Sequence, residues 1–319
     1  MLFTRENALA LAARHESHVR HIRESQQLHS LGLNAGGVDF LLTGFRSFTQ
    51  DERGTPRMNP TTRLLQMISH ATLNSPIEAT SQPQFPQAEP HAKHLLTIGL
   101  ARVGGFRCVT AVGDVDHATP AAFVELARAA KPKAVLSLGL GPESILEVGA
   151  TNRINASRPA YDCDGRDRPG VFPAGETLDE GQSPDFECAL PWGESTLERL
   201  RRVLTMRWQA DHGSSGPLGR VTVASRARPD NDYLCNSTAW LFARLLERPA
   251  TPPPLNWIAA ERGAATVTVP GLSGLGIQKS GFLHLAPVPA PSEGYFLAAA
   301  NLLVDVTRAM DVWTSNEMR

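Results

Sequence analysis

The sequence predicts a three-layer α/β/α sandwich built on a mixed, mainly parallel central sheet. Short apolar runs, typical of buried strands, alternate with longer amphipathic stretches, typical of helices, through residues 39–319. Residues 107–112, 120–130 and 134–139 give the order strand, helix, strand, and a crossover of this kind joins parallel strands. Of the 319 residues, 42% are hydrophobic and 20% are charged, which is enough apolar material for one large core. We therefore expect a single α/β/α domain over residues 39–319.

The chain before this domain is predicted to be a helical extension over residues 1–38. Its amphipathic helix is expected to end at Gly32, ahead of the helix-breaking run NAGG. The first strand follows at residues 38–44, an apolar run that glycine ends, and a loop then leads to a helix at residues 61–68. Residues 75–95, which are rich in Pro, Gln and Ser, are expected to form an insertion.

The later elements continue the alternation. Further strands are expected at residues 220–224 and 281–285, and further helices at residues 194–208, 236–247 and 293–310. Two more insertions are expected at residues 165–185 and 248–279, and an extra hairpin strand at 265–269 lies within the second.

The charge balance and the cysteine usage exclude several classes of protein. There are 31 Lys and Arg residues against 32 Asp and Glu, so the chain as a whole has no basic field for nucleic acid or an anionic membrane. The four cysteines have no CxxC spacing, which argues against a zinc knuckle or a disulfide-rich scaffold and favours a reducing compartment. No apolar run approaches the roughly 20 residues of a membrane span, and residues 1–20 lack the apolar core of a signal peptide. We therefore expect a cytoplasmic protein that binds no nucleic acid, membrane or metal.

Three residues near predicted strand ends carry groups suited to nucleophilic catalysis. In an open α/β sheet, ligands bind where the strands end. Cys235 opens a predicted helix, Glu147 lies in a loop after a strand, and His284 lies near the end of another strand. A helix N-terminus favours a thiolate, a histidine can move a proton, and a carboxylate can orient that histidine. Each residue also has a structural interpretation, as a small core side chain, a core histidine and a solvated loop carboxylate.

Several short segments, in the same order along the chain, resemble the motifs of a known family. They are TGFRSF at 43–48 with NP at 59–60, the glycine-ended strand 134–139, EVGATN at 147–152, INASR at 154–158, ALP at 189–191, YLCN at 233–236 and GFLHLAP at 281–287. Together they resemble the pyroglutamyl peptidase I (pyrrolidone-carboxylate peptidase) family, the cysteine peptidases of family C15. The resemblance runs from about Asp39 to Asp305 and describes a long, divergent member with a phosphorylase/hydrolase-like fold.

The resemblance implies a catalytic triad of Cys235, His284 and Glu147, with Glu143 as an alternative to Glu147. The enzyme would be a cytoplasmic hydrolase, a thiol protease of the omega-peptidase kind, that removes an N-terminal pyroglutamyl (5-oxoprolyl) group from peptides. Cys235 would attack the carbonyl and form a thioester, which water would then cleave. The family implies a peptide or small amide substrate with a blocked N-terminus, no metal or organic cofactor, and a possible homo-oligomer.

The resemblance also assigns a substrate pocket. Phe45 and Phe48 would hold the flat lactam ring between them, and Arg158 would help to stabilise the oxyanion. The family has a glutamine near this ring where the chain has Leu140. This departure leaves two alternatives open, an amide hydrolase with a different acyl specificity and a catalytically silent homologue that binds a peptide.

Overall fold

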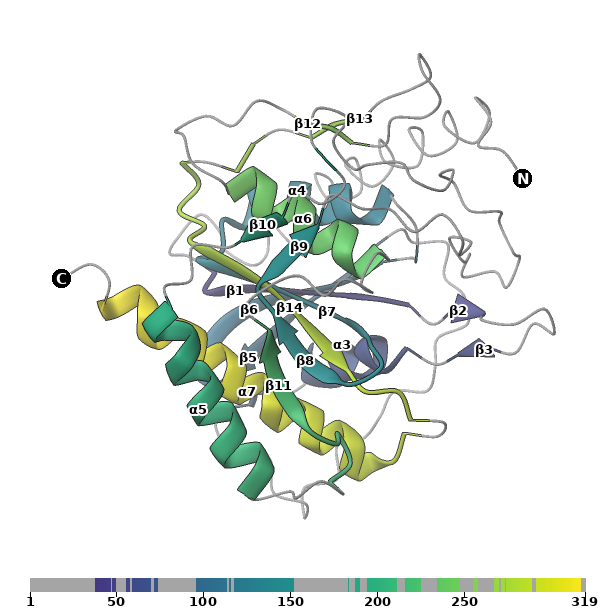
Figure 1. Ribbon diagram of the computed structural model, residues 1–319. Helices are drawn as coiled ribbons and strands as arrows, with labels where there is room; N and C mark the ends of the chain where they lie inside the picture. Colours follow the sequence, from purple (N-terminus) through teal and green to yellow (C-terminus); the bar gives the residue numbers. More distant parts are fainter. Residues whose placement is uncertain are drawn as a thin grey trace.

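The structure is a computed structural model with a central β-sheet (Figure 1), and it describes the following residues. They are residues 38–46, 48–49, 56–57, 59–69, 72–73, 96–113, 115, 118–151, 183, 187–189, 194–210, 216–224, 234–246, 255–257, 267–269, 271–272, 274–288 and 291–316. The predicted helical extension at 1–38, apart from Val38, lies outside the described residues. So do the predicted insertions at 75–95 and 165–185, apart from Ser183 in the second.

An eight-stranded sheet forms the middle of the molecule, in the order β11-β8-β14-β7-β1-β6-β5-β4. Its strands are β1 (Phe40–Phe45), β4 (Thr72–Leu73), β5 (Leu96–Val103), β6 (Phe106–Gly113), β7 (Ala134–Leu140), β8 (Ser144–Glu147), β11 (Val221–Ala224) and β14 (Lys279–Leu285). Three two-stranded sheets join β2 (Phe48–Thr49) to β3 (Pro56–Arg57), β9 (Gly149–Thr151) to β10 (Glu187–Ala189), and β12 (Leu255–Trp257) to β13 (Val267–Val269).

Strand directions make the main sheet mixed and mainly parallel, as the sequence predicts. β1 pairs in parallel with both β6 and β7, and β7 pairs in parallel with β14. The parallel pairs β4·β5 and β8·β11 lie toward the two edges. The pairs β5·β6 and β8·β14 are antiparallel. The expected crossover is present, because β6 and β7 run in parallel on either side of β1 and α4 (Ala118–Ala130) joins them.

Helices cover both faces of the sheet and complete the three predicted layers (Figure 1). α4 and α6 (Leu234–Leu246) pack on one face, where they contact β1, β6, β7 and β14. α3 (Pro60–Ser69), α5 (Glu194–Ala210) and α7 (Glu293–Asn316) pack on the other. The α/β/α fold class is therefore confirmed.

Local sequence explains where these elements begin. β1, with the sequence FLLTGF, is buried along its whole length, as expected of a strand covered on both sides. α3 begins after Asn59, whose side-chain oxygen accepts a hydrogen bond of 3.1 Å from the Thr61 N–H, and Pro60 occupies the first helical position. Ser292 caps α7 in the same way by accepting a 3.2 Å bond from the Tyr295 N–H.

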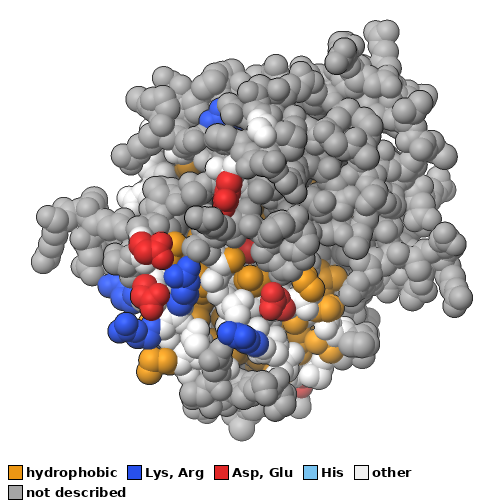
Figure 2. Space-filling view, viewed as in Figure 1, with side chains coloured by type: hydrophobic (Ala, Val, Ile, Leu, Met, Phe, Trp, Pro, Cys, Tyr) orange, Lys and Arg blue, Asp and Glu red, His pale blue; other side chains and the backbone are white. Residues whose placement is uncertain are grey.

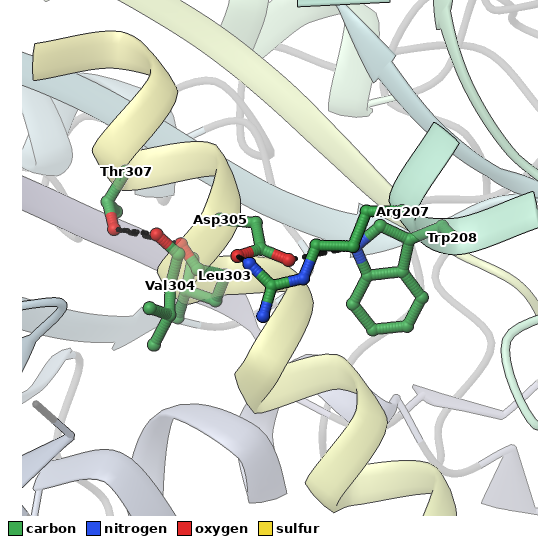
Figure 3. Close-up of polar contacts among 6 residues, drawn as sticks. All are labelled: Arg207, Trp208, Leu303, Val304, Asp305 and Thr307. Carbon is green, nitrogen blue, oxygen red and sulfur yellow. Dashed lines mark hydrogen bonds and ion pairs between the residues drawn. The ribbon is translucent and has the colours of Figure 1, made fainter. Parts of the chain in front are cut away.

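A buried carboxylate joins α5 to α7 (Figure 3). Asp305 of α7 is 4% exposed and accepts hydrogen bonds from the Arg207 guanidinium and, at 3.1 Å, from the Trp208 indole N–H. Burial raises the pKa of Asp305, while Arg207, Trp208 and Arg308 act in the opposite direction. This contact fixes two helices of one layer through a charge that is paired and hydrogen-bonded.

On the outer side of α5, acidic and basic side chains lie next to one another (Figure 2). Arg201 contacts Glu194 at 3.5 Å and Glu198 at 3.6 Å, and both glutamates are largely exposed. Ion pairs of this kind are solvated and contribute little to stability. Arg201 is thus part of a mixed, solvent-facing surface on α5.

The structure contains strands that the sequence did not predict, namely β2, β3, β4, β5, β8, β9, β10 and β12. β5 and β6 form an antiparallel hairpin whose turn contains Gly104 and Gly105, both with positive φ, whereas the sequence predicted the second strand alone. Glu147 was expected in a loop, yet it is the last residue of β8, a short strand that pairs with β14. None of the described helices is long and apolar enough to cross a membrane.

Candidate active site

The site lies where α6 begins, over the end of β7. Cys235 is the second residue of α6, as expected, and its thiol sits directly against the backbone of Gly139 in β7. A Cβ atom added to Gly139 would lie 2.7 Å from Cys235 Sγ and 2.7 Å from the Phe282 ring. The absence of a side chain at residue 139 therefore creates the space in which the sulfur sits.

The strand β14 brings His284 to the same level of the sheet. His284 is in register with Gly139 of the neighbouring parallel strand, so both residues face the layer that contains α6. Gly141 leaves room for the imidazole as Gly139 does for the thiol, because a Cβ at residue 141 would lie 2.7 Å from the His284 Cβ. The Phe282 ring stacks at a tilt on the imidazole, with centroids 4.8 Å apart.

Glu147 approaches His284 from β8, which pairs with the edge of β14 opposite to β7. β8 runs antiparallel to β14 and pairs Glu147 with Phe282, two residues before His284. Glu147 Oε1 lies 3.6 Å from His284 Nδ1, and the two residues are 1% and 3% exposed. This separation is longer than a hydrogen bond, but it places a carboxylate and an imidazole side by side inside the protein.

The surroundings of the Cys235 thiol act against the thiolate that its place at the start of a helix favours. Burial raises the pKa of Cys235 far above its ordinary value, and the negative charge of Glu147 raises it further. A hydrogen bond with its own backbone acts the other way and is outweighed. Desolvation and the nearby carboxylate therefore oppose the effect of the helix N-terminus, which favours the thiolate.

The structure also distinguishes between Glu143 and Glu147, the two carboxylates that the sequence left as alternatives. Glu143 lies in the turn between β7 and β8 with an exposed side chain, whereas Glu147 is buried beside His284. Glu147 is thus the carboxylate that the fold brings to the imidazole.

Of the four residues predicted to line the substrate pocket, the structure describes the side chains of two, Phe45 and Leu140. Phe45 is 3% exposed, and its ring packs against Phe123 of α4 with centroids 5.7 Å apart. Leu140 is the last residue of β7 and is partly exposed at the strand end. The side chain of Phe48 and the whole of Arg158 lie outside the described residues.

Sequence reasoning missed the residues that shape this site. Gly139 and Gly141 were assigned no part in the site, although they leave room for the thiol and the imidazole. The available signal was a pair of glycines at the end of a buried strand, which marks a place of close approach. Among the described residues, no group of three or more His, Cys, Asp or Glu side chains could hold a metal ion.

Comparison with known proteins gives distant structural likeness. No family model and no curated protein matches the chain. One similar solved structure is an AMP nucleosidase from Bacteroides thetaiotaomicron VPI-5482, with 14% identity over 95% of this chain and 99% of that chain and a TM-score of 0.36. A futalosine hydrolase mutant of Helicobacter pylori strain 26695 has 10% identity over 86% of this chain and 100% of that chain, with a TM-score of 0.32. A 5′-methylthioadenosine/S-adenosyl homocysteine nucleosidase from Campylobacter jejuni has 12% identity over 86% and 100%, with a TM-score of 0.33.

These findings correct the expected family. The similar structures are two nucleosidases and a futalosine hydrolase, not peptidases, and no family model supports family C15. The assignment to the pyroglutamyl peptidase family was therefore wrong. So were the thiol-protease and omega-peptidase activity and the peptide or amide substrate with a blocked N-terminus. The two alternatives that rested on the same resemblance lose their basis with it. TM-scores from 0.32 to 0.36 assign no substrate to this chain, so its chemistry must be argued from its own residues.

Proposed function

We propose that the chain is a hydrolase that acts on a small molecule through Cys235, His284 and Glu147. The observation that carries the proposal is the buried contact of 3.6 Å between Glu147 Oε1 and His284 Nδ1, next to a thiol that rests on bare backbone. Burying a carboxylate and an imidazole costs free energy unless they are paired. Buried titratable groups that cluster at a strand end are typical of reaction centres.

The first chemical route uses the thiol as the attacking group. His284 accepts the proton of Cys235 as the sulfur bonds to an electrophilic carbon of the substrate, and Glu147 stabilises the imidazolium that results. The protonated His284 then gives the proton to the leaving group. A water molecule, deprotonated by His284, cleaves the bond between sulfur and carbon and restores the thiol. The positive end of the α6 helix dipole lies beside Cys235 and can stabilise negative charge that develops on the substrate near the sulfur.

A second route is favoured by the raised pKa of Cys235. If the thiol keeps its proton throughout, Glu147 and His284 form a general acid and base pair that activates water directly. This chemistry suits hydrolysis of a glycosidic bond, in which one group donates a proton to the leaving group and another activates the attacking water. Cys235 then forms part of the wall of the site.

Hydrolysis assays on matched variants distinguish the two routes. The probes are 4-nitrophenyl acetate for an acyl bond, and AMP and 5′-methylthioadenosine for a glycosidic bond. Cys235→Ala is compared with Cys108→Ala, which removes a buried thiol from β6. Loss of activity in Cys235→Ala alone supports the thiol route. Activity that survives in Cys235→Ala and disappears in Glu147→Gln and His284→Gln supports direct attack by water. Activity retained in all of these variants overturns the proposal.

A further inference from the structure

The backbone of Ala286, two residues after His284, is held at both of its polar groups by buried side-chain hydroxyls. Its N–H donates a hydrogen bond of 3.1 Å to the Ser144 Oγ, and its C=O accepts a bond of 2.7 Å from the Tyr295 hydroxyl. Both side chains belong to other elements, β8 and α7. The chain is therefore fixed immediately after the strand that carries the imidazole.

Ser144 joins three segments through one oxygen atom. It is fully buried, accepts from the Ala286 N–H, and donates a bond of 2.8 Å to the Leu218 C=O just before β11. Ser144 is also the first residue of β8, the four-residue strand that ends with Glu147. The same short strand thus carries the carboxylate at one end and a hydrogen bond to the end of β14 at the other.

Tyr295 completes the contact from the opposite layer. It is 1% exposed and lies in the first turn of α7, which Ser292 caps. Burial raises the pKa of Tyr295, so its hydroxyl keeps a proton to donate at any ordinary pH. A long, deeply packed helix therefore anchors the backbone beyond His284.

The anchoring of the Ala286 backbone is important because the His284 imidazole and the Glu147 carboxylate lie just beyond hydrogen-bond distance. At 3.6 Å the two groups are a few tenths of an ångström beyond hydrogen-bond range. A small movement of the end of β14 relative to β8 would therefore change whether the carboxylate bonds to the imidazole. Beyond the strand ladder, the Ser144 bond is a side-chain link between the ends of these two strands.

We propose that Ser144 and Tyr295 are positioning residues that set the separation of the His284 imidazole from the Glu147 carboxylate. This inference deepens the proposed function and rests on it for its catalytic meaning. The two hydroxyls touch no reacting atom and act through the backbone of Ala286.

The test compares Ser144→Ala and Tyr295→Phe with Thr307→Val. Thr307 is a matched control because it is also buried in α7, but its hydroxyl bonds to the carbonyls of Leu303 and Val304 in its own helix. Histidine-labelled protein gives the titration midpoint of the His284 imidazole by NMR, with His284→Gln used to identify its signal. Glu147→Gln shows how far the midpoint moves when the carboxylate charge is removed, which is downward because that charge favours the imidazolium.

We expect Ser144→Ala and Tyr295→Phe to move the midpoint in the same direction as Glu147→Gln, by a smaller amount, and Thr307→Val to leave it unchanged. With a hydrolysed probe, kcat should fall by ~10-fold while KM changes little, since a misplacement of about 1 Å can cost up to about 100-fold. Tyr295→Phe removes a single oxygen atom and decides the question if Ser144→Ala does not fold. A midpoint unchanged in the folded Tyr295→Phe variant would overturn the inference. The NMR readout needs no substrate, so absence of turnover with every probe would count against the proposed function alone.

Discussion

The Nδ1 atom of His284 lies 3.6 Å from the Oε1 atom of Glu147, with both side chains inside the protein. The contact depends on the pairing of β8 with β14, which sets Glu147 beside Phe282, two residues before His284. The register of one four-residue strand therefore brings the carboxylate to the imidazole.

Replacing Glu147 by Gln should lower kcat on any hydrolysed probe by about 100-fold or more. The amide keeps the size of the side chain but removes the charge that stabilises the imidazolium, and acid–base catalysis contributes on the order of 100-fold to 10,000-fold. Steady-state kinetics measures the effect. Glu143→Gln, a change at an exposed carboxylate, should stay within about twofold of wild type. Equal losses in the two variants would show that Glu147 has no special role.

Gly139→Ala should displace the thiol of Cys235. The new methyl group would come within 2.7 Å of both Cys235 Sγ and the Phe282 ring, and overpacking of this kind costs about 1–3 kcal/mol. We expect a lower melting temperature together with slower alkylation of Cys235 by iodoacetamide.

Gly281→Ala is the matched control for this change. A Cβ at residue 281 of β14 meets its nearest atoms at 3.6 Å, which is ordinary van der Waals contact. Its alkylation rate should equal that of wild type. Normal alkylation in Gly139→Ala as well would contradict the close packing of strand and thiol.

The thiols of Cys108 and Cys235 should make the folded protein less stable at high pH. Burial raises the pKa of Cys108 from 9.0 to about 12, and burial with the charge of Glu147 raises that of Cys235 even further. The contribution of the protonated thiols to stability is fully present below the ordinary thiol pKa of 9.0, where both the folded protein and the unfolded chain keep these protons. Above it the unfolded chain loses protons that the folded protein keeps, so the free energy of unfolding falls with rising pH, by up to roughly 1.4 kcal/mol per pH unit for each thiol.

Equilibrium denaturation at several pH values between about 8 and 10 measures this slope. Cys108→Ala should make the decline shallower, whatever its effect on stability at pH 7. A slope that the substitution leaves unchanged would show that Cys108 ionises as readily in the folded protein as in the unfolded chain.

Asp305→Ala should destabilise the protein by about 2 kcal/mol, because it leaves the buried Trp208 N–H without its acceptor and removes the partner of Arg207. Arg207 is 39% exposed, so solvent replaces part of that ion pair. Denaturant unfolding gives the value. Glu194→Ala removes an exposed ion-pair partner on α5 and should change stability by less than about 0.5 kcal/mol. Similar losses in both variants would argue against a structural role for the α5–α7 contact.

Much of the fold could be predicted from local pattern, and the parts that could not depend on distant pairing. Buried apolar runs located β1, β7 and β14. The described helices were placed within two residues at each end, except that α7 continues to Asn316 rather than ending at residue 310. β8 was missed because its sequence, SILE, is too short to show a period. Its antiparallel direction depends on contacts with residues that lie far along the chain.

The sequence identified the residues of the candidate site one by one, but it did not show how they contact one another or how deeply they are buried. Cys235, His284 and Glu147 were each named from residue type and position, and the structure places the first against Gly139 and the other two together. The influences that raise the pKa of the thiol were not predicted, because helix position is visible in a sequence whereas burial and the approach of Glu147 are not. The family was also wrong. Its motifs were short and rich in glycine and apolar residues, which many α/β folds use at strand ends.

The hydrolysis rate of His284→Gln tests the central claim most directly, because both chemical routes pass a proton through this imidazole. With 4-nitrophenyl acetate, AMP and 5′-methylthioadenosine as probes, the wild type should hydrolyse at least one. The variant should lose about 100-fold or more of that activity while its unfolding transition shows that it is folded. Full activity in folded His284→Gln, or no hydrolysis of any probe by the wild type, would contradict the proposal that Cys235, His284 and Glu147 form a hydrolytic centre.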